Sequence, residues 1–577
     1  MRRDLAALAA GGFDLVVVGG GMFGAAAALD AAQRGLKVAL VERGDFCGAT
    51  SAHSFKMLHG GIRYLQHADL PRIRQSAAAR AAFLRVAPHL ASPLPIAVPT
   101  YGLGMKGRPA LVAGMAAYDL LTLGRNRGIA DRSRRVPPGR FMSRDEAIRR
   151  FPGLPREGLT GAGVFCDGQM YNPARLVLAF VQSAADLGAV CVNHLEAVGL
   201  TVRDGRVRAV EVRDRFSGER FQVGARLVLN AAGPYAERLL AGTQGAALSS
   251  PTPFSRDAYF VVGRRLVEGD CALTITTRTT DPDAVLSRGG RHLFLVPWRG
   301  VTLVGVWHKV YQGDPDRYEI TEDELATWTA EINEAYPGLD LGPDDVVLGS
   351  AGLVPFGEND PDAKDLKYAH RSRLVDHAKE RGPEGLVTLI GVRYTTGPFD
   401  AAEAVGLACR KLLMGRVPAS RLAWTPVRGG EVDDFEALVR LILAEAPAGT
   451  DAAAARALAH NHGSAFGEVV GLCAARPELG RPLPGSTVLG AEVVHAARAE
   501  MAETLADVAF RRTDLCTAGP PAPGSLREAA RLMSDARGWD GARTAAELAH
   551  VEERLRLART GRALLDDGGL SRVPLAA

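Results

Sequence analysis

Long uninterrupted hydrophobic runs are missing from this 577-residue sequence. A membrane-spanning helix needs about 18 or more consecutive apolar residues, and no such run occurs. The amino terminus is basic and then apolar, but Asp4 and the glycines after Val18 interrupt it, which argues against a signal peptide. We therefore expect no membrane span, so that any membrane attachment is peripheral.

Lysine and paired cysteines are also scarce. Only eight of the 69 basic residues are lysines, and 65 acids leave a net charge of +4, which gives no support to nucleic-acid binding. The seven cysteines lie scattered, without a C-x-x-C pair or a histidine spacing typical of zinc. We expect reduced cysteines in a cytoplasmic protein, no nucleic-acid partner and no metal site, with His460 and His462 interpreted as helix-end residues.

The segment from residue 14 to residue 43 has the pattern of a nucleotide-binding strand–helix–strand unit. Strands are expected at Leu15–Val18 and Val38–Val41, with an alanine-rich helix from Gly24 to Gln33 between them. The first glycine of a G-x-G-x-x-G pattern permits a tight turn, the second lets the backbone approach a pyrophosphate, and the third lets helix and strand pack closely. An acid at the end of the second strand can accept from ribose hydroxyls and argues against a 2′-phosphate. The three glycines are Gly19, Gly21 and Gly24, and the acid is Glu42.

The motif alone does not separate NAD from FAD, but the chain after Glu42 does. It continues without a second strand–helix–strand unit and is rich in serine, threonine and glycine, which suits an extended cofactor or an ordinary polar loop. Within it, Ala49–Ser51, Lys56 and the stretch LHGGIRYLQ (58–66) resemble the hallmark of the FAD-dependent glycerol-3-phosphate dehydrogenases. That family belongs to the wider group of D-amino-acid-oxidase-like flavoproteins.

Further resemblance follows in order along the chain and covers about residues 13 to 415. Asn172 is expected to cap a helix that begins at Pro173, a second cofactor-contacting turn follows a strand at "NAAGP" (230–234), and residues 293–315 are expected to form a hairpin. The resemblance implies FAD as the cofactor. It implies the following FAD-contacting residues: Gly19, Gly21, Gly24, Glu42, Arg43, Thr50, Ser51, Lys56, His59, Gly60, Gly61, Ala232, Gly233, Gly391, Thr395 and Thr396.

The fold class expected from these segments is α/β: a Rossmann-like FAD-binding domain, an interleaved α+β substrate domain and an all-helical C-terminal domain. The FAD-binding domain would use residues 1–100, 155–250 and 345–420, and the substrate domain 101–154 and 251–344. Turns at Asp204-Gly205 and Ser217-Gly218 predict a β-meander within the first of these domains. Composition shifts to helical spacing near residue 425, so 425–577 is predicted to be the helical domain.

The substrate pocket implied by the resemblance is only partly retained. Arg63, Tyr64 and Arg371 match substrate-binding residues of the family, and Arg393 stands where the family usually has lysine, which keeps the charge but changes the geometry. Val354 stands where a phosphate-contacting arginine is expected. The family's G-T-T-D is replaced by Gly305–His308, and an expected histidine appears as Tyr259. The fold is thus expected to be kept and the pocket rebuilt.

Three residues are candidates for catalysis: Tyr259, His308 and Arg393. Each has a plainer interpretation, since Tyr259 could be core packing and a hairpin histidine such as His308 is often merely exposed; His59 could be structural. The resemblance implies oxidation of a secondary alcohol, glycerol 3-phosphate or a related substrate, by hydride transfer to flavin. The alternatives are a flavin enzyme acting on a non-phosphorylated hydroxy compound or an amine, or a flavoprotein without turnover.

The partners implied by the resemblance are a small-molecule substrate and a quinone or other electron acceptor. Peripheral contact with the inner face of the cytoplasmic membrane and a homodimer are left open. The sequence also leaves open whether Cys47, His53 or another residue links covalently to the flavin.

Overall fold

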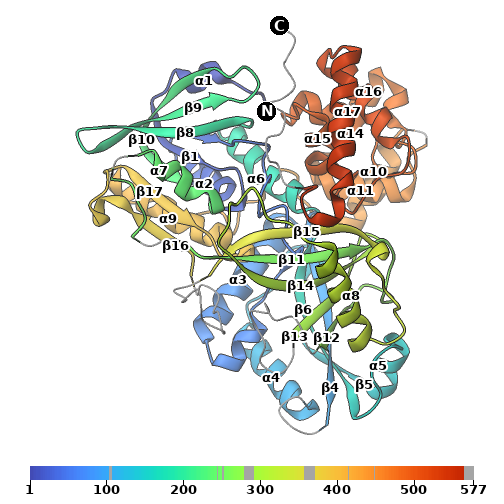
Figure 1. Cartoon of the computed structure of the whole chain (residues 1–577). Coiled ribbons are helices and arrows are strands. Elements are labelled where there is room, and N and C mark those ends of the chain that lie inside the picture. Colours follow the sequence, from blue (N-terminus) through green and yellow to red (C-terminus); the bar gives the residue numbers. More distant parts are fainter. Residues whose placement is uncertain are drawn as a thin grey trace.

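The computed structural model describes residues 1–102, 107–243, 245–249, 252–277, 291–356, 371–412, 415–447 and 449–564. Two β-sheets and a group of C-terminal helices make up the molecule (Figure 1). The first sheet lies at the upper left of the view, the second lies below it, and the C-terminal helices lie at the upper right.

The first sheet is mostly parallel and is built around the predicted nucleotide-binding unit. The predicted strands and helix form at β1 (Phe13–Val18), β2 (Val38–Val41) and α2 (Met22–Gln33). The strand order is β16-β17-β10-β1-β2-β7, with β16 antiparallel. The other strands are β7 (Val190–Val192), β10 (Arg220–Asn230), β16 (Arg373–Asp376) and β17 (Leu386–Ile390).

Both faces of β1 are buried because different elements cover them. Leu15 and Val17 pack in one apolar cluster with α2, α6 (Pro173–Asp186) and α9 (Gly397–Lys411). Val16 and Val18 point to the opposite face, as alternation along a strand requires, and pack against α1 (Leu5–Ala9), the meander strands and α7 (Ala236–Ala241). This accounts for the continuous apolar run in the sequence.

The predicted meander and the predicted helix cap are both confirmed. β8 (Leu195–Arg203), β9 (Arg206–Asp214) and β10 form consecutive antiparallel hairpins, with Asp204 and Gly205 at positive φ in the first turn. At the start of α6 the Asn172 side chain accepts from the backbone N–H of Ala174 at 3.1 Å, and Pro173 follows it.

The second sheet has the order β15-β11-β14-β13-β12-β4-β6-β3, and β5 pairs with β6. The predicted hairpin forms in it as β13 and β14. β3, β4, β6 and β15 lie largely in ranges assigned from the sequence to the FAD-binding domain, so the predicted division by residue range remains a proposal. The strands are β3 (Met57–Leu58), β4 (Ala91–Tyr101), β5 (Arg140–Ser143), β6 (Leu159–Met170), β11 (Phe254–Val262), β12 (Ala272–Thr277), β13 (Arg291–Trp298), β14 (Val301–Tyr311) and β15 (Val346–Pro355).

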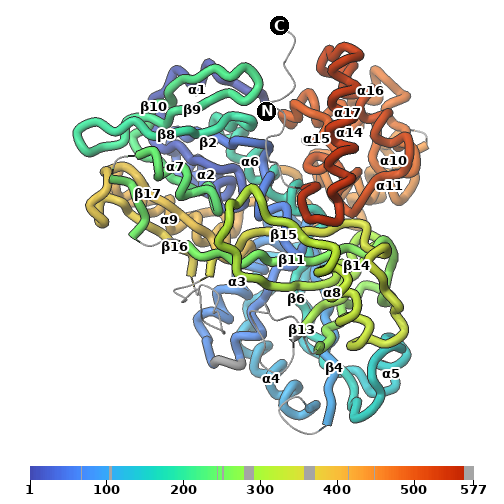
Figure 2. Tube along the Cα trace, in the orientation of Figure 1, coloured from blue at the N-terminus to red at the C-terminus, as the bar shows by residue number. Residues whose placement is uncertain are grey.

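Helices cover the second sheet and its approach to the first. α8 (Glu322–Ala335) packs through Trp328 on Trp307 of β14, with ring centroids 4.5 Å apart. α3 (Leu70–Val86), α4 (Arg108–Leu121) and α5 (Arg144–Arg150) surround the lower part of the molecule, where the tube in Figure 2 shows α4 at the periphery.

The C-terminal part is helical, as predicted. It pairs α10 with α11 and packs α14, α16 and α17 together, with a short π-helix at Val508–Arg512. The amino terminus reaches this part, since the Met1 amine donates to the carbonyl of Ala499 at 2.6 Å. The helices are α10 (Phe435–Glu445), α11 (Ala452–His462), α12 (Gly467–Val470), α13 (Leu472–Ala475), α14 (Gly490–Ala499), α15 (Leu505–Asp507), α16 (Ser525–Arg537) and α17 (Gly541–Arg556).

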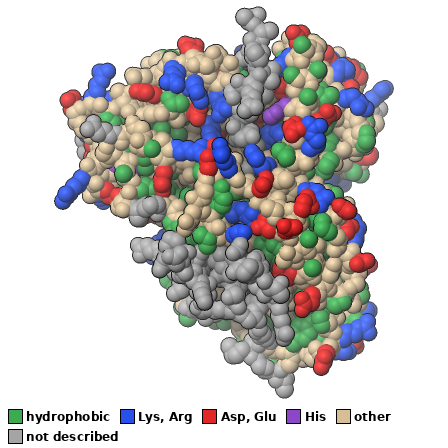
Figure 3. Space-filling model, viewed as in Figure 1, with side chains coloured by type: hydrophobic (Ala, Val, Ile, Leu, Met, Phe, Trp, Pro, Cys, Tyr) green, Lys and Arg blue, Asp and Glu red, His purple; other side chains and the backbone are tan. Residues whose placement is uncertain are grey.

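Basic and acidic side chains are interspersed over the face shown in Figure 3, as the near balance of charges suggests. Within the described ranges, no helix has the length and apolar character that crossing a bilayer requires. All seven cysteines are buried and unbridged.

Candidate functional site

A cavity of 2390 Å³ connects the first sheet with the second. On one side it is lined by residues that follow the carboxyl ends of β1, β2, β10 and β17, and on the other by residues of β11, β14 and β15. Pockets for small molecules usually measure about 300–1,000 Å³. The cavity therefore has room for an extended cofactor together with a second ligand.

The glycine turn after β1 forms the floor of this cavity. Gly19 has φ +104°, and a Cβ there would lie 2.7 Å from the carbonyl oxygen of Ala231. A Cβ on Gly24 would lie 1.8 Å from the carbonyl oxygen of Gly19, so this position accepts no side chain. The first and third glycines thus have the roles predicted for them, while Gly21 stands at the N-cap of α2 and lines the cavity.

Glu42 lies beside that turn at the end of β2. Its carboxylate accepts from the backbone N–H of Gly20 at 2.6 Å and of Gly44 at 2.9 Å. The neighbouring Arg43 stacks on the ring of Tyr235 and pairs with Asp316 at 2.9 Å. Both residues line the cavity, where the acid and the α2 N-terminus can face a ribose and a phosphate respectively.

The serine-rich loop after β2 closes over the same turn. The hydroxyl of Ser51 accepts from the N–H of Met22 at 3.0 Å, at the first turn of α2, and Thr50 donates to the carbonyl of Leu353 at 3.1 Å. His53 donates to or accepts from Ser350 at 2.9 Å, and burial lowers its pKa to about 3. The loop is thereby held between α2 and β15.

The LHGG segment is held by Asp167 of β6, which sequence reasoning did not identify. One carboxylate oxygen lies 3.1 Å from His59 Nδ1 and the other accepts from Gly60 N at 2.6 Å. A Cβ on Gly60 would collide with the guanidinium of Arg80, so this glycine is required for packing. Gly61 has φ +86° and lines the cavity with His59.

Two buried groups meet where the second sheet borders the cavity. The Lys56 ammonium donates to the hydroxyl of Tyr259, which in turn donates to the carbonyl of Ser54 at 3.1 Å. Burial lowers the pKa of Lys56 to about 7 and raises the pKa of Tyr259. Tyr259 lines the cavity, so it both packs in the core and reaches the candidate site.

His308 and Asp257 form a pair on neighbouring strands of the second sheet. They are direct partners in the β11–β14 register, and His308 Nδ1 lies 2.9 Å from Asp257 Oδ1. Ser255 donates to the same carboxylate oxygen at 2.6 Å. Both members of the pair line the cavity. Asp257 was missed because only the strand pairing, which local sequence does not specify, places it opposite His308.

Arg393 enters the cavity from the turn after β17. Its guanidinium donates to the hydroxyls of Tyr64 and Ser76, each at 3.2 Å, and to Gln75 at 3.4 Å. Among the described residues it has no carboxylate within ion-pair distance, and the same is true of Arg63, which lines the cavity nearby. Two arginines therefore line the cavity without an acidic partner in the part of the chain that the structure describes.

Comparison with known proteins agrees with this geometry. Residues 14–393 match the family described as FAD dependent oxidoreductase. The chain belongs to this family. Residues 423–544 match the C-terminal domain of alpha-glycerophosphate oxidase.

Among the similar proteins are two named as glycerol-3-phosphate dehydrogenases. The protein from Synechocystis is 29% identical over 91% of this chain and 93% of its own length. The probable mitochondrial enzyme of Caenorhabditis elegans is 32% identical over 93% of this chain and 72% of its own length. The solved structure of glycerol-3-phosphate dehydrogenase from Bacillus halodurans, complexed with FAD, has a TM-score of 0.74 at 22% identity and covers 96% of this chain and 97% of its own. That likeness shows the shared fold.

The residues present fit the FAD of an FAD-dependent oxidoreductase. The glycine turn leaves the α2 N-terminus open to the cavity, and Gly391 lies so close to the ring of Phe23 that a Cβ there would be 2.0 Å away. The cavity lining includes the predicted contacts Gly19, Gly21, Glu42, Arg43, Thr50, Ser51, His59, Gly61, Ala232, Gly233, Gly391 and Thr395.

Several residues predicted from the sequence lie behind the lining of the cavity instead. Gly24 and Gly60 are packing positions, Lys56 reaches the site through Tyr259, and Thr396 is buried and donates to Asp400 at 3.0 Å. Arg371 borders a smaller neighbouring cavity of 550 Å³, which Arg393 also lines. Direct contact of these residues with cofactor or substrate remains a prediction.

Residues that depart from the family pattern also line this cavity. Val354 of β15 lines it, as do Val306 and His308 of β14. Of the two residues considered for a covalent flavin link, His53 lines the cavity. Cys47 is fully buried, and burial raises the pKa of its thiol to about 12. A thiol in such a setting is inert.

Proposed function

We propose that this FAD-dependent oxidoreductase oxidises the secondary alcohol of a small anionic substrate, glycerol 3-phosphate or a close relative. The observation that carries the proposal is the pair Arg63 and Arg393, which face the cavity without an acidic partner among the described residues. Arg393 is half-buried and Arg63 is exposed. A half-buried guanidinium such as that of Arg393 favours a bound anion, and arginine binds phosphate with particular geometric fit. The names of the similar proteins support the same substrate.

His308 is the residue proposed to take the hydroxyl proton. A carboxylate at Nδ1 holds the proton on that nitrogen, which makes Nε2 the acceptor. Bound FAD would supply hydride acceptance from the alcohol carbon. Tyr64 and Ser76 hold the Arg393 guanidinium in position, so that the substrate anion is fixed while the proton moves to His308. Tyr259 contributes a hydroxyl held by Lys56.

A second candidate function is oxidation of a non-phosphorylated hydroxy compound or an amine. Val354 favours it, because the cavity wall is apolar where the family pattern has an arginine. An arginine–phosphate contact contributes about 1.5–3 kcal/mol, and valine supplies none of it.

The test is anaerobic reduction of the protein-bound flavin, followed by its visible absorbance. The panel contains glycerol 3-phosphate, glycerol, 2-hydroxy acids and amino acids. We expect bleaching by glycerol 3-phosphate and none by glycerol at the same concentration. Bleaching by a non-phosphorylated compound alone would support the second candidate, and no bleaching by any hydroxy compound or amine would contradict both.

We also propose that the protein contacts the membrane peripherally and passes electrons to a quinone. The support is α4, whose Leu111 and Met115 line the cavity while Val112 and Leu120 are exposed on its other side. Leu120 and the following Leu123 are 68% and 77% exposed. An apolar surface next to the cavity offers a route from a lipid surface toward the flavin site. Cytoplasmic location on the inner face of the membrane belongs to the same proposal.

A further inference from the structure

Lys56 is buried beside the cavity without a carboxylate that offsets its charge. The residue is 3% exposed, and its ammonium donates to the hydroxyl of Tyr259 and, at 3.4 Å, to the carbonyl of Ala52. No carboxylate in the described part of the chain pairs with it. The rings of Tyr259 and Trp298 lie near the ammonium instead, with their centroids 5.0 and 5.3 Å from its nitrogen. A buried charge in this state is unfavourable.

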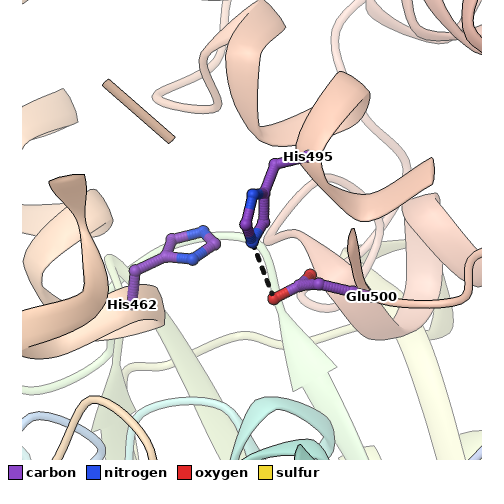
Figure 4. A group of neighbouring side chains, drawn as sticks. All are labelled: His462, His495 and Glu500. Carbon is purple, nitrogen blue, oxygen red and sulfur yellow. Dashed lines mark ion pairs between the residues drawn. The ribbon is translucent and has the colours of Figure 1, made fainter. Parts of the chain in front are cut away.

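The buried carboxylate of Glu500, by contrast, has a counter-ion. Figure 4 shows Glu500 with the side chains of His462 and His495, and His495 Nε2 lies 3.6 Å from one of its oxygens. Burial lowers the pKa values of His462 and His495 to about 3 and about 4, so both rings are neutral. The Arg175 guanidinium donates to the other oxygen of Glu500 at 2.6 Å and offsets its charge. Lys56 has no group in the place of Arg175 among the described residues.

The titratable groups around Lys56 add no negative charge at neutral pH. They belong to the loop after β2, to β11 and to the turn after β13, and they are Cys47, His53, Tyr259 and Arg299. Burial keeps the first three uncharged, since it lowers the pKa of His53 to about 3 and raises the pKa values of Cys47 and Tyr259. Arg299 is a cation, which Asp514 offsets at 3.1 Å. Burial lowers the pKa of Lys56 itself to about 7, and a negative charge brought near it would raise that pKa.

The backbone of Lys56 is also in an unfavourable conformation. Its φ is +57°, in the left-handed region that residues other than glycine seldom adopt. The carbonyl of Lys56 accepts from the backbone N–H of Met170 at the end of β6 at 2.7 Å, which helps to hold this conformation. Such strain is found mainly where function requires it. A left-handed backbone and an uncompensated charge therefore coincide at one residue next to the cavity.

The chemistry of an FAD-dependent oxidoreductase brings a negative charge into this cavity. A hydride carries two electrons and one proton to the cofactor, which therefore gains one negative charge, while the substrate gives up the hydride and releases a proton to a base. Tyr259, whose hydroxyl contacts Lys56, lines the cavity in which this charge arises. A fixed cation in surroundings of low dielectric constant stabilises such a charge without rearrangement.

We propose that the positive charge of Lys56 stabilises the reduced, negatively charged cofactor and so raises its reduction potential. Lys56 acts by its charge, from behind Tyr259, and does not itself contact the substrate. In the oxidised protein the charge is uncompensated and destabilises the fold, and reduction of the cofactor supplies its counter-ion. The role is the same whichever substrate delivers the hydride.

The first experiment measures the reduction potential of the bound FAD in Lys56→Met, by anaerobic titration against a reference dye at pH 6 without substrate. At that pH, below the pKa of about 7, the wild-type ammonium is charged in both states of the cofactor. We expect the ratio of reduced to oxidised FAD at a fixed potential to fall at least about tenfold, which is about 30 mV for a two-electron couple. Lys56→Arg keeps the charge and should recover part of the wild-type potential. An unchanged potential in Lys56→Met would overturn the proposal.

The matched control is Lys37→Met, which removes the same charge from an exposed lysine. Lys37 precedes β2, at the end of the strand opposite the cavity, and its ammonium donates to the carbonyl of Gly11 at 3.0 Å. This variant should keep the wild-type potential. Tyr259→Phe removes the hydroxyl and keeps the ammonium, so its potential should stay closer to that of the wild type than the potential of Lys56→Met. A larger fall in Tyr259→Phe than in Lys56→Met would assign the effect to the hydroxyl and contradict the proposal.

Thermal stability separates this role from a structural one. Burial lowers the pKa of Lys56 in the folded protein below its value in the unfolded chain, so the ammonium destabilises the fold, most strongly below pH 7. At pH 6, with oxidised FAD bound, Lys56→Met should therefore have a Tm equal to or higher than that of the wild type. A lower Tm together with an unchanged potential would show that Lys56 only supports the fold.

Discussion

At the scale of single residues, two glycines of the turn after β1 are required for different reasons. Gly24 is fixed by the protein itself, since a Cβ would meet the carbonyl of Gly19. A Cβ on Gly21 would lie 3.0 Å from Ser51 Oγ, which is the end of a small side chain on a loop. Gly21 is therefore required chiefly by what the cavity holds.

Replacing Gly21 with valine is expected to abolish FAD retention while the fold survives. The branched side chain would occupy the space in which the backbone approaches the pyrophosphate. The measurement is FAD per chain in the purified protein, with secondary structure followed by circular dichroism. Gly242→Ala is the control, because no atom lies within 4 Å of a Cβ at that position and its φ is unstrained. Full FAD occupancy in the valine variant would show that the turn is only structural.

The Asp257–His308 pair predicts two losses of activity. His308→Gln removes the proposed proton acceptor, so kcat should fall by about 10²–10⁴-fold. Asp257→Asn removes the carboxylate that lies 2.9 Å from His308 Nδ1 and holds the proton on that nitrogen, so kcat should also fall, whereas Asp257→Glu should recover part of the wild-type kcat. Steady-state kinetics with glycerol 3-phosphate measure the three variants. Wild-type kcat in His308→Gln would remove His308 from the proton-accepting role.

Val354→Arg distinguishes the two candidate substrate classes. If the substrate carries a phosphate, the new guanidinium should lower KM for glycerol 3-phosphate about tenfold or more, with a smaller effect on glycerol. If the natural substrate carries no negative charge beside residue 354, an unpaired guanidinium in the cavity should reduce activity on that substrate. Steady-state kinetics with both substrates measure the two effects, which have opposite signs. A variant that gains nothing on glycerol 3-phosphate would favour the second candidate function.

At the scale of elements, α4 has apolar residues on two sides. Its inner side lines the cavity, and its outer side leaves Val112 and Leu120 exposed. Arg127, which is exposed, follows four residues after exposed Leu123. An apolar surface bordered by an exposed arginine is suited to an anionic lipid surface.

Charge placed on this surface should therefore weaken membrane binding. The double variant Leu120→Glu, Leu123→Glu is expected to sediment with phosphatidylglycerol vesicles at least about tenfold less than the wild type. Leu187→Glu is the matched control, because Leu187 is 55% exposed at the end of α6 and lies away from the cavity. Equal sedimentation of all three proteins would contradict a role for α4.

Elements with a local signal could be predicted from the sequence, and those defined by distant pairing could not. β1, α2 and β2 follow from periodicity and the glycine spacing, and Asn172 follows from its own capping chemistry. The membership of β4 and β15 in the second sheet depends on register with strands far away in the chain. The same holds for Asp257 and Asp167, which reach the site only through that pairing. His462 was interpreted as a helix-end residue, and its neighbours Glu492 and His495 come from another helix.

At the scale of the whole molecule, buried ion pairs connect the C-terminal helices to the FAD-binding sheet. Arg512 of the π-helix makes two hydrogen bonds to the carboxylate of Asp45, one at 2.7 Å, and both residues are almost wholly buried. Asp514 accepts from Tyr171 and Asn172 at 2.7 and 3.0 Å. Each charge at this junction depends on its partner, because a buried charge left unpaired is strongly unfavourable.

Removing one member of the Asp45–Arg512 pair should destabilise the protein by about 3–5 kcal/mol, because the other charge would remain buried without its partner. The expected result for Asp45→Asn is a marked fall in Tm. Arg531→Gln is the control, since Arg531 pairs with Glu528 on the surface, where such pairs contribute little. A Tm for Asp45→Asn equal to that of the control would show that the pair is not needed to join the two parts.

Because one cavity lies between the two sheets, it also bears on the order in which substrate and electron acceptor can reach the flavin. The predicted cofactor contacts and the substrate arginines line the same space, so an electron acceptor that approaches through it competes with substrate and product for room beside the flavin. If the acceptor takes that path, the product must leave before the acceptor can reach the reduced flavin, and each half of the turnover proceeds with the other partner absent. Double-reciprocal plots at several acceptor concentrations should then be parallel lines, and high substrate concentrations should slow the enzyme by occupying the reduced form.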